Sequence, residues 1–368
     1  MSSIYELRLH KLRDYLEKKQ IDIALITNPT NIYFFTGFHS NPHERFMALI
    51  VDMGSARESM IVPGLDLEAA QQHSFVRDLI PCSDSENPYA LLKDKVGRTR
   101  IATLGLEKKA ISLYRVEQLQ ALFPDVHCTD IEPFIIQERL IKSEEDLVSI
   151  RRAVDIAEKV LESTVQKVKV GMMEQELAAE LEYKMRMFGG DKPSFESIIL
   201  TGKRSSLPHG KPGAYSIQEN DFLLFDFGVY AGGFCSDITR TFLVGEGTKE
   251  QETIYETVLA ANLAAIQAVK VGTPYGIIDQ TGRGVIAAKG YGAYFNNRIG
   301  HGLGLDVHED PSINGENEML IEPGHVFTIE PGIYLLSLGG VRIEDDVYVQ
   351  PNGQVEVLTH YPKQLRRL

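Results

Sequence analysis

Residues 222–244 read FLLFDFGVYAGGFCSDITRTFLV, which is two apolar runs joined by glycines. This pattern predicts two strands of an antiparallel hairpin. Asp226 lies in the first run and Asp237 in the second. A turn centred between Ala231 and Gly232 would place the two carboxylates opposite each other, with Cβ atoms about 4.5–5.5 Å apart. Two buried like charges repel, so the hairpin predicts a cation beside them.

A second hairpin with two carboxylates is expected further along the chain. Glu330 lies in FTIEP and Glu344 in VRIED, and a turn centred on Ser337 would place them face to face. The segment GHGLG adds His301, an imidazole that its neighbouring glycines leave accessible. Four carboxylates and one imidazole suit two divalent cations, and such an oxygen-rich ligand set favours Mn²⁺, with Co²⁺, Zn²⁺ and Fe²⁺ left open. A pair of cations can activate water and polarise a carbonyl, so we expect amide hydrolysis.

The sequence on either side of these hairpins predicts two domains. The first third alternates apolar runs with helical patterns, which is typical of an α/β layer. A capping-box pattern at Ser143 starts a long helix, and from Glu196 onward strands and helices mix as in an α+β domain. We therefore expect an N-terminal α/β domain over residues 1–130, a linker over 131–142 and a catalytic domain over 143–368.

Composition excludes several classes of partner. Lys and Arg total 38 against 51 Asp and Glu, and the net charge of −13 argues against nucleic acid or an anionic membrane as the ligand. Three scattered cysteines form no disulfide framework, which favours a reducing, cytoplasmic location. Charged residues follow closely after the N-terminus without an apolar run, so we expect neither a secretory signal nor a membrane anchor.

Five motifs carry a resemblance to a known family: Asp226-x-Gly228, Ser236-Asp-x-Thr-Arg-Thr241, His301-Gly-x-Gly304, Glu330-Pro-Gly332 and Val341-Arg-Ile-Glu344. In order and spacing they resemble the pita-bread metallopeptidases, which include methionine aminopeptidase, aminopeptidase P and prolidase. The segments Asn31-Ile-x-Phe-x-Thr-Gly-Phe38 and Leu207-Pro-His-Gly210 look like the bacterial Xaa-Pro dipeptidases. The resemblance spans essentially the whole chain. It implies an α+β pita-bread domain behind a smaller creatinase-like α/β domain, in a homodimer.

The resemblance also implies residue roles. The positions that match the family's metal ligands are Asp226, Asp237, His301, Glu330 and Glu344, with Asp237 and Glu344 bridging two cations. Glu330 would shuttle the proton of a metal-bridging hydroxide to the leaving proline nitrogen. His209 and His308 match histidines that hydrogen-bond the substrate and stabilise the intermediate. Arg342 would orient carboxylate ligands or bind substrate.

The choice between dipeptidase and aminopeptidase P depends on a cation that binds the free carboxylate of proline. In some prolidases an arginine follows the His-Glu-x-Pro segment, but here Ser312 follows Pro311. Two substitutes are available: Arg298, and the loop that contains His43 and Arg45. We expect this loop to reach and cap an active site, either in its own subunit or in a partner subunit. The expected function is hydrolysis of Xaa-Pro dipeptides.

Other functions are kept as alternatives. Aminopeptidase P would release the N-terminal residue from longer Xaa-Pro peptides. A creatinase-like amidinohydrolase shares the fold but lacks the metal ligands, and a non-catalytic peptide-binding module would lose them, whereas all five positions are present here.

Overall fold

The structure of the protein is a computed structural model that describes residues 3–98 and 100–368. The chain divides into two compact units, Met1–Arg139 and Leu140–Leu368. The expected linker over 131–142 contains a helix, α6 (Glu132–Leu140), and the division between the units falls near its end.

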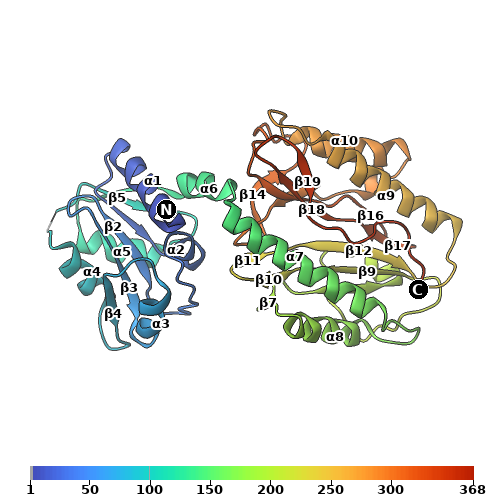
Figure 1. The fold of residues 1–368 in the computed structure, drawn as a ribbon, viewed down its shortest axis with the longest axis horizontal. Coiled ribbons are helices and arrows are strands. Elements are labelled where there is room, and N and C mark those ends of the chain that lie inside the picture. Colours follow the sequence, from blue (N-terminus) through green and yellow to red (C-terminus); the bar gives the residue numbers. More distant parts are fainter. Residues whose placement is uncertain (1–2, 99) are drawn as a thin grey trace. The chain divides into compact units, whose positions relative to one another are not determined.

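Unit 1 is an α/β layer around one six-stranded sheet, with strand order β4-β3-β2-β1-β5-β6 (Figure 1). Its strands are β1 (Ile23–Ile26), β2 (Ala48–Asp52), β3 (Arg57–Pro63), β4 (Leu79–Cys82), β5 (Thr103–Leu106) and β6 (His127–Asp130). Its helices before α6 are α1 (Ile4–Lys18), α2 (Pro29–Thr36), α3 (Leu67–His73), α4 (Pro88–Val96) and α5 (Leu113–Leu122), with a 3₁₀ turn η1 (Gly64–Asp66). Parallel pairs β1–β5, β5–β6 and β3–β4 flank the antiparallel β1–β2–β3 centre. The predicted α/β class of the N-terminal domain agrees with this sheet.

Unit 2 repeats a helix pair followed by strands. The first round is α7 (Glu144–Val165), α8 (Glu174–Met187), β7 (Lys192–Pro193), β8 (Ile198–Thr201), η2 (Gly202–Ser206), β9 (Phe222–Phe227), β10 (Val229–Ala231), β11 (Phe234–Cys235) and β12 (Ile238–Leu243). The second is α9 (Lys249–Ala268), α10 (Gly276–Ala288), η3 (Gly292–Tyr294), β13 (Gly300–Gly302), β14 (Glu309–Ile313), β15 (Val326–Ile329), β16 (Gly332–Leu335), β17 (Gly339–Arg342), β18 (Asp345–Val349) and β19 (Val355–Val357). The predicted capping box at Ser143 begins α7 as expected.

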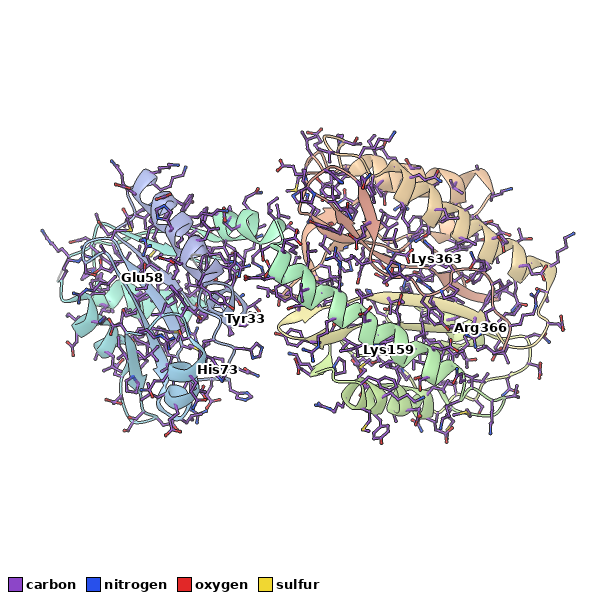
Figure 2. All side chains as sticks on the ribbon, in the orientation of Figure 1. Tyr33, Glu58, His73, Lys159, Lys363 and Arg366 are labelled. Atoms are coloured by element: carbon purple, nitrogen blue, oxygen red, sulfur yellow. The ribbon has the colours of Figure 1, made fainter. Side chains whose placement is uncertain are left out.

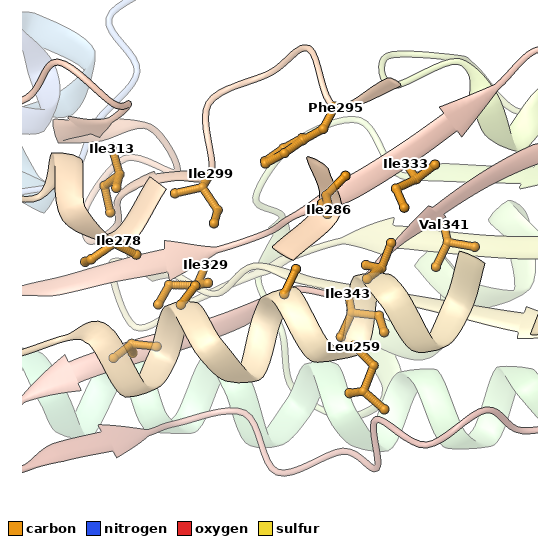
Figure 3. Packing of buried hydrophobic residues seen from close by; sticks show 14 of the residues in the cluster. Leu259, Ile278, Ile286, Phe295, Ile299, Ile313, Ile329, Ile333, Val341 and Ile343 are labelled. Carbon is orange, nitrogen blue, oxygen red and sulfur yellow. The ribbon is translucent and has the colours of Figure 1, made fainter. Parts of the chain in front are cut away.

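Two hydrophobic cores lie against the strands of unit 2. One joins α7 and α8 to β8, β9 and β12, and the other joins α9 and α10 to β15, β16, β17 and β18. In the second core, α9 and α10 contribute Leu259, Ile278 and Ile286, which pack with strand residues such as Ile329 and Val341 (Figure 3). The carboxylate-bearing strands are therefore held between two helix pairs, which places their charged residues in the interior of the unit (Figure 1).

The first hairpin has a different register from the predicted one. Tyr230 pairs with Cys235 and Asp226 pairs with Thr239, so Asp237 lies two residues closer to the turn than the position opposite Asp226. The predicted turn position was wrong because Gly232 and Gly233 form the turn, both with positive φ (60° and 89°), as a tight two-residue hairpin turn requires. The shift is two residues, and because side chains alternate with a period of two, Asp226 and Asp237 still share a face.

The second hairpin has the predicted register. Ile329 pairs with Asp345 in one ladder and Gly332 pairs with Arg342 in the next, and both ladders are centred on Ser337. Glu330 and Glu344 lie opposite each other where the first ladder gives way to the second. Both side chains therefore lie where the β15–β18 ladder ends and the β16–β17 ladder begins.

The C-terminal segment of unit 2 closes over the hairpins. Lys363 and Arg366 belong to this segment (Figure 2). Lys363 donates to Asp345 Oδ2 at 2.8 Å, and Arg366 pairs with Glu162 of α7 at 2.7 Å. Among the described residues, no helix has the length and hydropathy that a membrane span requires.

Candidate metal centre

Three buried side chains offer ligand atoms to a single point in unit 2. Asp237, His301 and Glu344 each have one such atom, and these atoms lie within 4.8 Å of one another. Asp237 precedes β12, His301 is the middle residue of β13, and Glu344 lies between β17 and β18. The two hairpins and the glycine-flanked strand therefore meet as the sequence predicts.

The hydrogen bonds of His301 leave one ring nitrogen free to act as a ligand. Its Nδ1 lies 3.0 Å from the carbonyl of Gly302, so Nδ1–H donates and Nε2 carries the lone pair. This Nε2 lies 3.7 Å from Asp237 Oδ2 and 3.5 Å from Glu330 Oε1. Burial, together with nearby His308, lowers the pKa of His301 to about 3, so the ring is neutral, as metal binding requires.

The carboxylates of this site are destabilised as anions. Burial, reinforced by the Glu344 carboxylate, raises the pKa of Asp237 well above its usual range. Burial, reinforced by Glu330, does the same to the pKa of Glu344, and burial raises the pKa of Glu330 to about 7. Such shifts identify a place where negative charges are collected without enough protein cations to balance them.

Arg342 is the one buried arginine that directly contacts a carboxylate of this group within the described residues. It pairs with Asp226, donates to Thr239 Oγ1 at 3.1 Å and donates to the hydroxyl of Tyr334 at 2.8 Å. Thr239 in turn donates to Glu344 Oε2 at 2.7 Å. Asp226 and Glu344 are thus oriented through a chain of hydrogen bonds that runs across three strands.

The residues fit divalent cations. Two buried carboxylate oxygens, Asp237 Oδ1 and Glu344 Oε1, have no hydrogen-bond partner among the described residues. A buried anionic oxygen without a donor is costly, and a hard cation is the partner that oxygen donors of this kind accept. With Asp226 and Glu330 beside them, the set provides four carboxylates and one neutral imidazole.

A cavity of about 390 Å³ opens onto this group. Its apolar lining comprises Phe195, Ile198, Pro208 and Tyr334, and its polar lining includes His209, Asn297, Arg298, His308 and the carboxylates. This volume is within the range of small-ligand pockets. His308 stacks edge-on against His301 with ring centroids 4.4 Å apart, and burial lowers the pKa of His308. Both histidines that were expected on the substrate side therefore border the cavity.

Arg298 also lines the cavity and differs from Arg342 in its contacts. Its guanidinium donates to Ser312 Oγ at 3.1 Å, and no carboxylate of the described chain forms an ion pair with it. Ser312 occupies the position after the His-Glu-x-Pro segment where some prolidases have an arginine. Arg298, which precedes β13, therefore brings a cation to the place that Ser312 leaves without one.

The loop that contains His43 and Arg45 belongs to unit 1. Arg45 donates to both oxygens of Asp84 and lies 3.2 Å from Glu44, in a separate hollow of about 820 Å³. His43 is exposed and has a φ of 53°. The charge of Arg45 is therefore already neutralised within its own unit, and the expected cap over an active site stays a prediction.

Several residues of the cavity were missed from the sequence. Tyr334 lies four residues after Glu330 on the following strand, so alternation alone could have indicated it. Phe195 and Asn297 gave no signal, because they lie on connections whose path depends on the whole fold, and the first residue of β8, Ile198, reads as an ordinary apolar strand residue. The buried Asn297 Oδ1 has no hydrogen-bond partner among the residues described.

Comparison with known proteins agrees with this architecture. The model of metallopeptidase family M24 matches residues 148–351, and that of the creatinase/prolidase N-terminal domain matches residues 8–141. An uncharacterized peptidase of Staphylococcus aureus is 40% identical over 356 residues, which cover 97% of this chain and 99% of that protein.

Two solved structures are similar over nearly the full length. The Xaa-Pro dipeptidase from Bacillus anthracis has a TM-score of 0.91 and 31% identity, covering 99% of this chain and 100% of that one. The X-Pro aminopeptidase from Thermotoga maritima has a TM-score of 0.89 and 32% identity, covering 98% and 99%. The chain therefore belongs to metallopeptidase family M24, with an α+β pita-bread domain that follows a creatinase/prolidase N-terminal domain.

Proposed function

We propose that this metallopeptidase is an Xaa-Pro dipeptidase that uses two divalent cations. Asp226, Asp237, His301, Glu330 and Glu344 would hold the two ions. When bound, the ions, for which the oxygen-rich set favours Mn²⁺, lower the pKa of the attacking water and polarise the scissile carbonyl.

Glu330 moves the proton in this proposal. The leaving proline nitrogen must gain a proton as the C–N bond breaks, because it would otherwise leave as a strongly basic anion. Glu330 borders the cavity beside the other predicted ligands, where its carboxylate can accept a proton from the attacking water and then donate it. Its Oε1 lies beside His301 Nε2, at the edge of the ligand group.

The histidines and Arg342 act on the substrate and on the ligands. Neutral His308, whose pKa burial lowers, and His209 can donate N–H groups to the substrate carbonyl as negative charge develops on it. Arg342 contacts Asp226, which supports the predicted role of orienting a carboxylate ligand rather than a direct contact with substrate.

The observation that carries the choice of a dipeptidase is Arg298. Among the described residues, it is the cation of the cavity that forms no ion pair with a carboxylate, and the neighbouring lining of Phe195, Ile198 and Pro208 suits a proline ring. A free proline carboxylate would pair with this guanidinium, with Ser312 as a second donor. A longer peptide has no carboxylate at that position and would leave Arg298 desolvated without a partner.

The test uses metal-stripped protein titrated with Mn²⁺ and three peptides, Leu-Pro, Leu-Pro-Pro and Leu-Leu. We expect metal-dependent cleavage of Leu-Pro that Glu330→Gln abolishes. Leu-Pro amide then replaces Leu-Pro: the protein should discriminate against it by about 10–100-fold, and Arg298→Gln should remove most of that discrimination. Arg151→Gln, which alters an arginine outside the cavity, is the matched control.

Other results would change the assignment. Preference for Leu-Pro-Pro would make the enzyme an aminopeptidase P, and metal binding without turnover of any peptide would indicate a binding module. Residual discrimination after Arg298→Gln would direct attention to His43 and Arg45, acting from a second subunit of the expected homodimer.

A further inference from the structure

A buried ion pair outside the cavity lies at the base of the loop that carries His209. Glu174, the first residue of α8, is fully buried, and its carboxylate is paired with Arg204, whose Nε lies 3.1 Å from each oxygen. Glu174 lines no part of the cavity. A fully desolvated carboxylate is retained only where its partners compensate for the loss of water.

The partners of Glu174 come from both sides of the loop. The backbone N–H of Thr201 donates to Oε1 at 2.9 Å, and that of Gly213 donates to Oε2 at 3.0 Å. Arg204 extends the connection, because its second nitrogen donates to the carbonyl of Lys211 at 2.6 Å. One side chain therefore joins a residue before His209 to a residue after it.

Two further contacts fix the same segment. The guanidinium of Arg204 lies 3.9 Å above the ring of Tyr215. Ser205 Oγ accepts the backbone N–H of Gly340 in β17 at 2.8 Å, which ties the loop to the hairpin that carries Glu330 and Glu344. The tip, in contrast, is held by few contacts: His209 is exposed as a residue and reaches the cavity together with Pro208.

We infer that Glu174 and Arg204 are positioning residues that hold His209 at the substrate cavity. This inference rests on the proposed role of His209 as a substrate donor. A hydrogen-bond donor is effective only when it is held at the place where charge develops, and a displacement near 1 Å can cost up to about 100-fold in rate. The loop has a second ion pair, between Lys211 and Glu196 at 2.7 Å, but both of its side chains are exposed, and exposed ion pairs contribute little to holding a segment.

The test is Glu174→Gln, which keeps the shape of the side chain, removes its charge and places an NH₂ group against the donors. We expect kcat/KM for Leu-Pro to fall about ten-fold through kcat, with the circular dichroism spectrum unchanged. In a His209→Ala background the same substitution should cause no further loss. Arg204→Met provides a second route to the same result if Glu174→Gln folds poorly.

The control removes another ion pair of the same unit. Glu356→Gln breaks the contact between Arg151 and Glu356 and should leave kcat/KM unchanged. An equal loss in Glu356→Gln, or losses of Glu174→Gln and His209→Ala that multiply, would overturn the inference.

A readout without activity separates this inference from the proposed function. Trypsin should cut native Glu174→Gln after Lys203, which is exposed, faster than it cuts the parent protein. Equal cleavage of the two proteins would contradict a bracing role. Absence of peptidase activity in the parent would refute the proposed function while leaving this comparison valid.

Discussion

Asp237→Asn should stabilise the metal-free protein, although it removes a predicted metal ligand. In the absence of cations, Asp237 faces Glu344 across at most 4.8 Å, and both side chains are buried. At an effective dielectric constant of 20, two unit charges at that separation repel by about 3 kcal/mol. The pKa of both groups is raised, chiefly by burial, so proton uptake relieves part of this repulsion as the pH falls.

The magnitude follows from these two effects. We expect a gain of about 1–2 kcal/mol in the free energy of unfolding at pH 8, and a smaller gain at pH 6, where the carboxylates hold protons more often. For a unit of this size the gain corresponds to a melting temperature about 2–8 °C higher. The amide that replaces the Asp237 carboxylate could also donate to Glu344 Oε1, which has no partner within the described chain.

The assay is thermal unfolding of chelator-treated protein with and without added Mn²⁺. The parent should gain stability on adding metal, since a ligand that binds only the folded state shifts the unfolding equilibrium, and Asp237→Asn should gain little. The reasoning is refuted if the metal-free variant is less stable than the metal-free parent at pH 8, or if Mn²⁺ stabilises both equally.

Three further changes test other contacts. Gly304→Ala would place a Cβ 2.8 Å from the Glu309 carboxylate, so urea unfolding should show a loss of about 1–3 kcal/mol. Arg342→Met removes the cation beside Asp226, and Mn²⁺ affinity, measured by calorimetry, should fall about 10–100-fold. Burial, aided by Lys142, lowers the pKa of His325 to about 4, against 6.5 in the unfolded chain. The neutral form therefore contributes stability that is fully present above pH 6.5, and about 3 kcal/mol of it is lost as the pH falls to 4. His325→Gln should flatten this part of the pH profile of urea unfolding.

Each of these has an outcome that would count against it. An unchanged unfolding midpoint in Gly304→Ala would mean that the neighbouring carboxylate moves aside easily. Unaltered Mn²⁺ affinity in Arg342→Met would leave Asp226 oriented by other means. A parallel pH profile for His325→Gln would assign the acid sensitivity to other groups.

The carboxylate strands were predictable because their signal is local. Side chains alternate between the two faces of a strand, so a register that differs by two residues from the predicted one still leaves Asp226 and Asp237 on one face. The error in the turn position therefore did not separate them. Glu330 and Glu344 were paired correctly because the hairpin keeps one register on both sides of them, centred on Ser337.

Contacts between distant segments could not be predicted in the same way. Glu174 reads as an ordinary acidic residue in the first turn of a helix, and only the path of the 201–213 loop buries it. Lys142 was assigned to a linker, yet its ammonium pairs with Glu309 at 2.9 Å, and both side chains are buried. No local pattern distinguishes either residue from a solvated charge.

The three consecutive acids at 344–346 show why the surroundings of a carboxylate matter more than its sequence. Strand alternation sends Asp345 away from Glu344, and there Arg240 and Lys363 both pair with it. Burial acts to raise the pKa of Asp345, but these two cations outweigh it and the pKa falls, whereas the pKa of neighbouring Glu344, equally buried, rises. Asp345 thus has two ion-pair partners, whereas the Glu344 carboxylate has none among the described residues. This contrast supports the prediction that Glu344 and Asp237 are metal ligands and that Asp345 is a structural anion. Asp346, whose pKa burial also raises, accepts the backbone N–H of Asp237 at 3.1 Å.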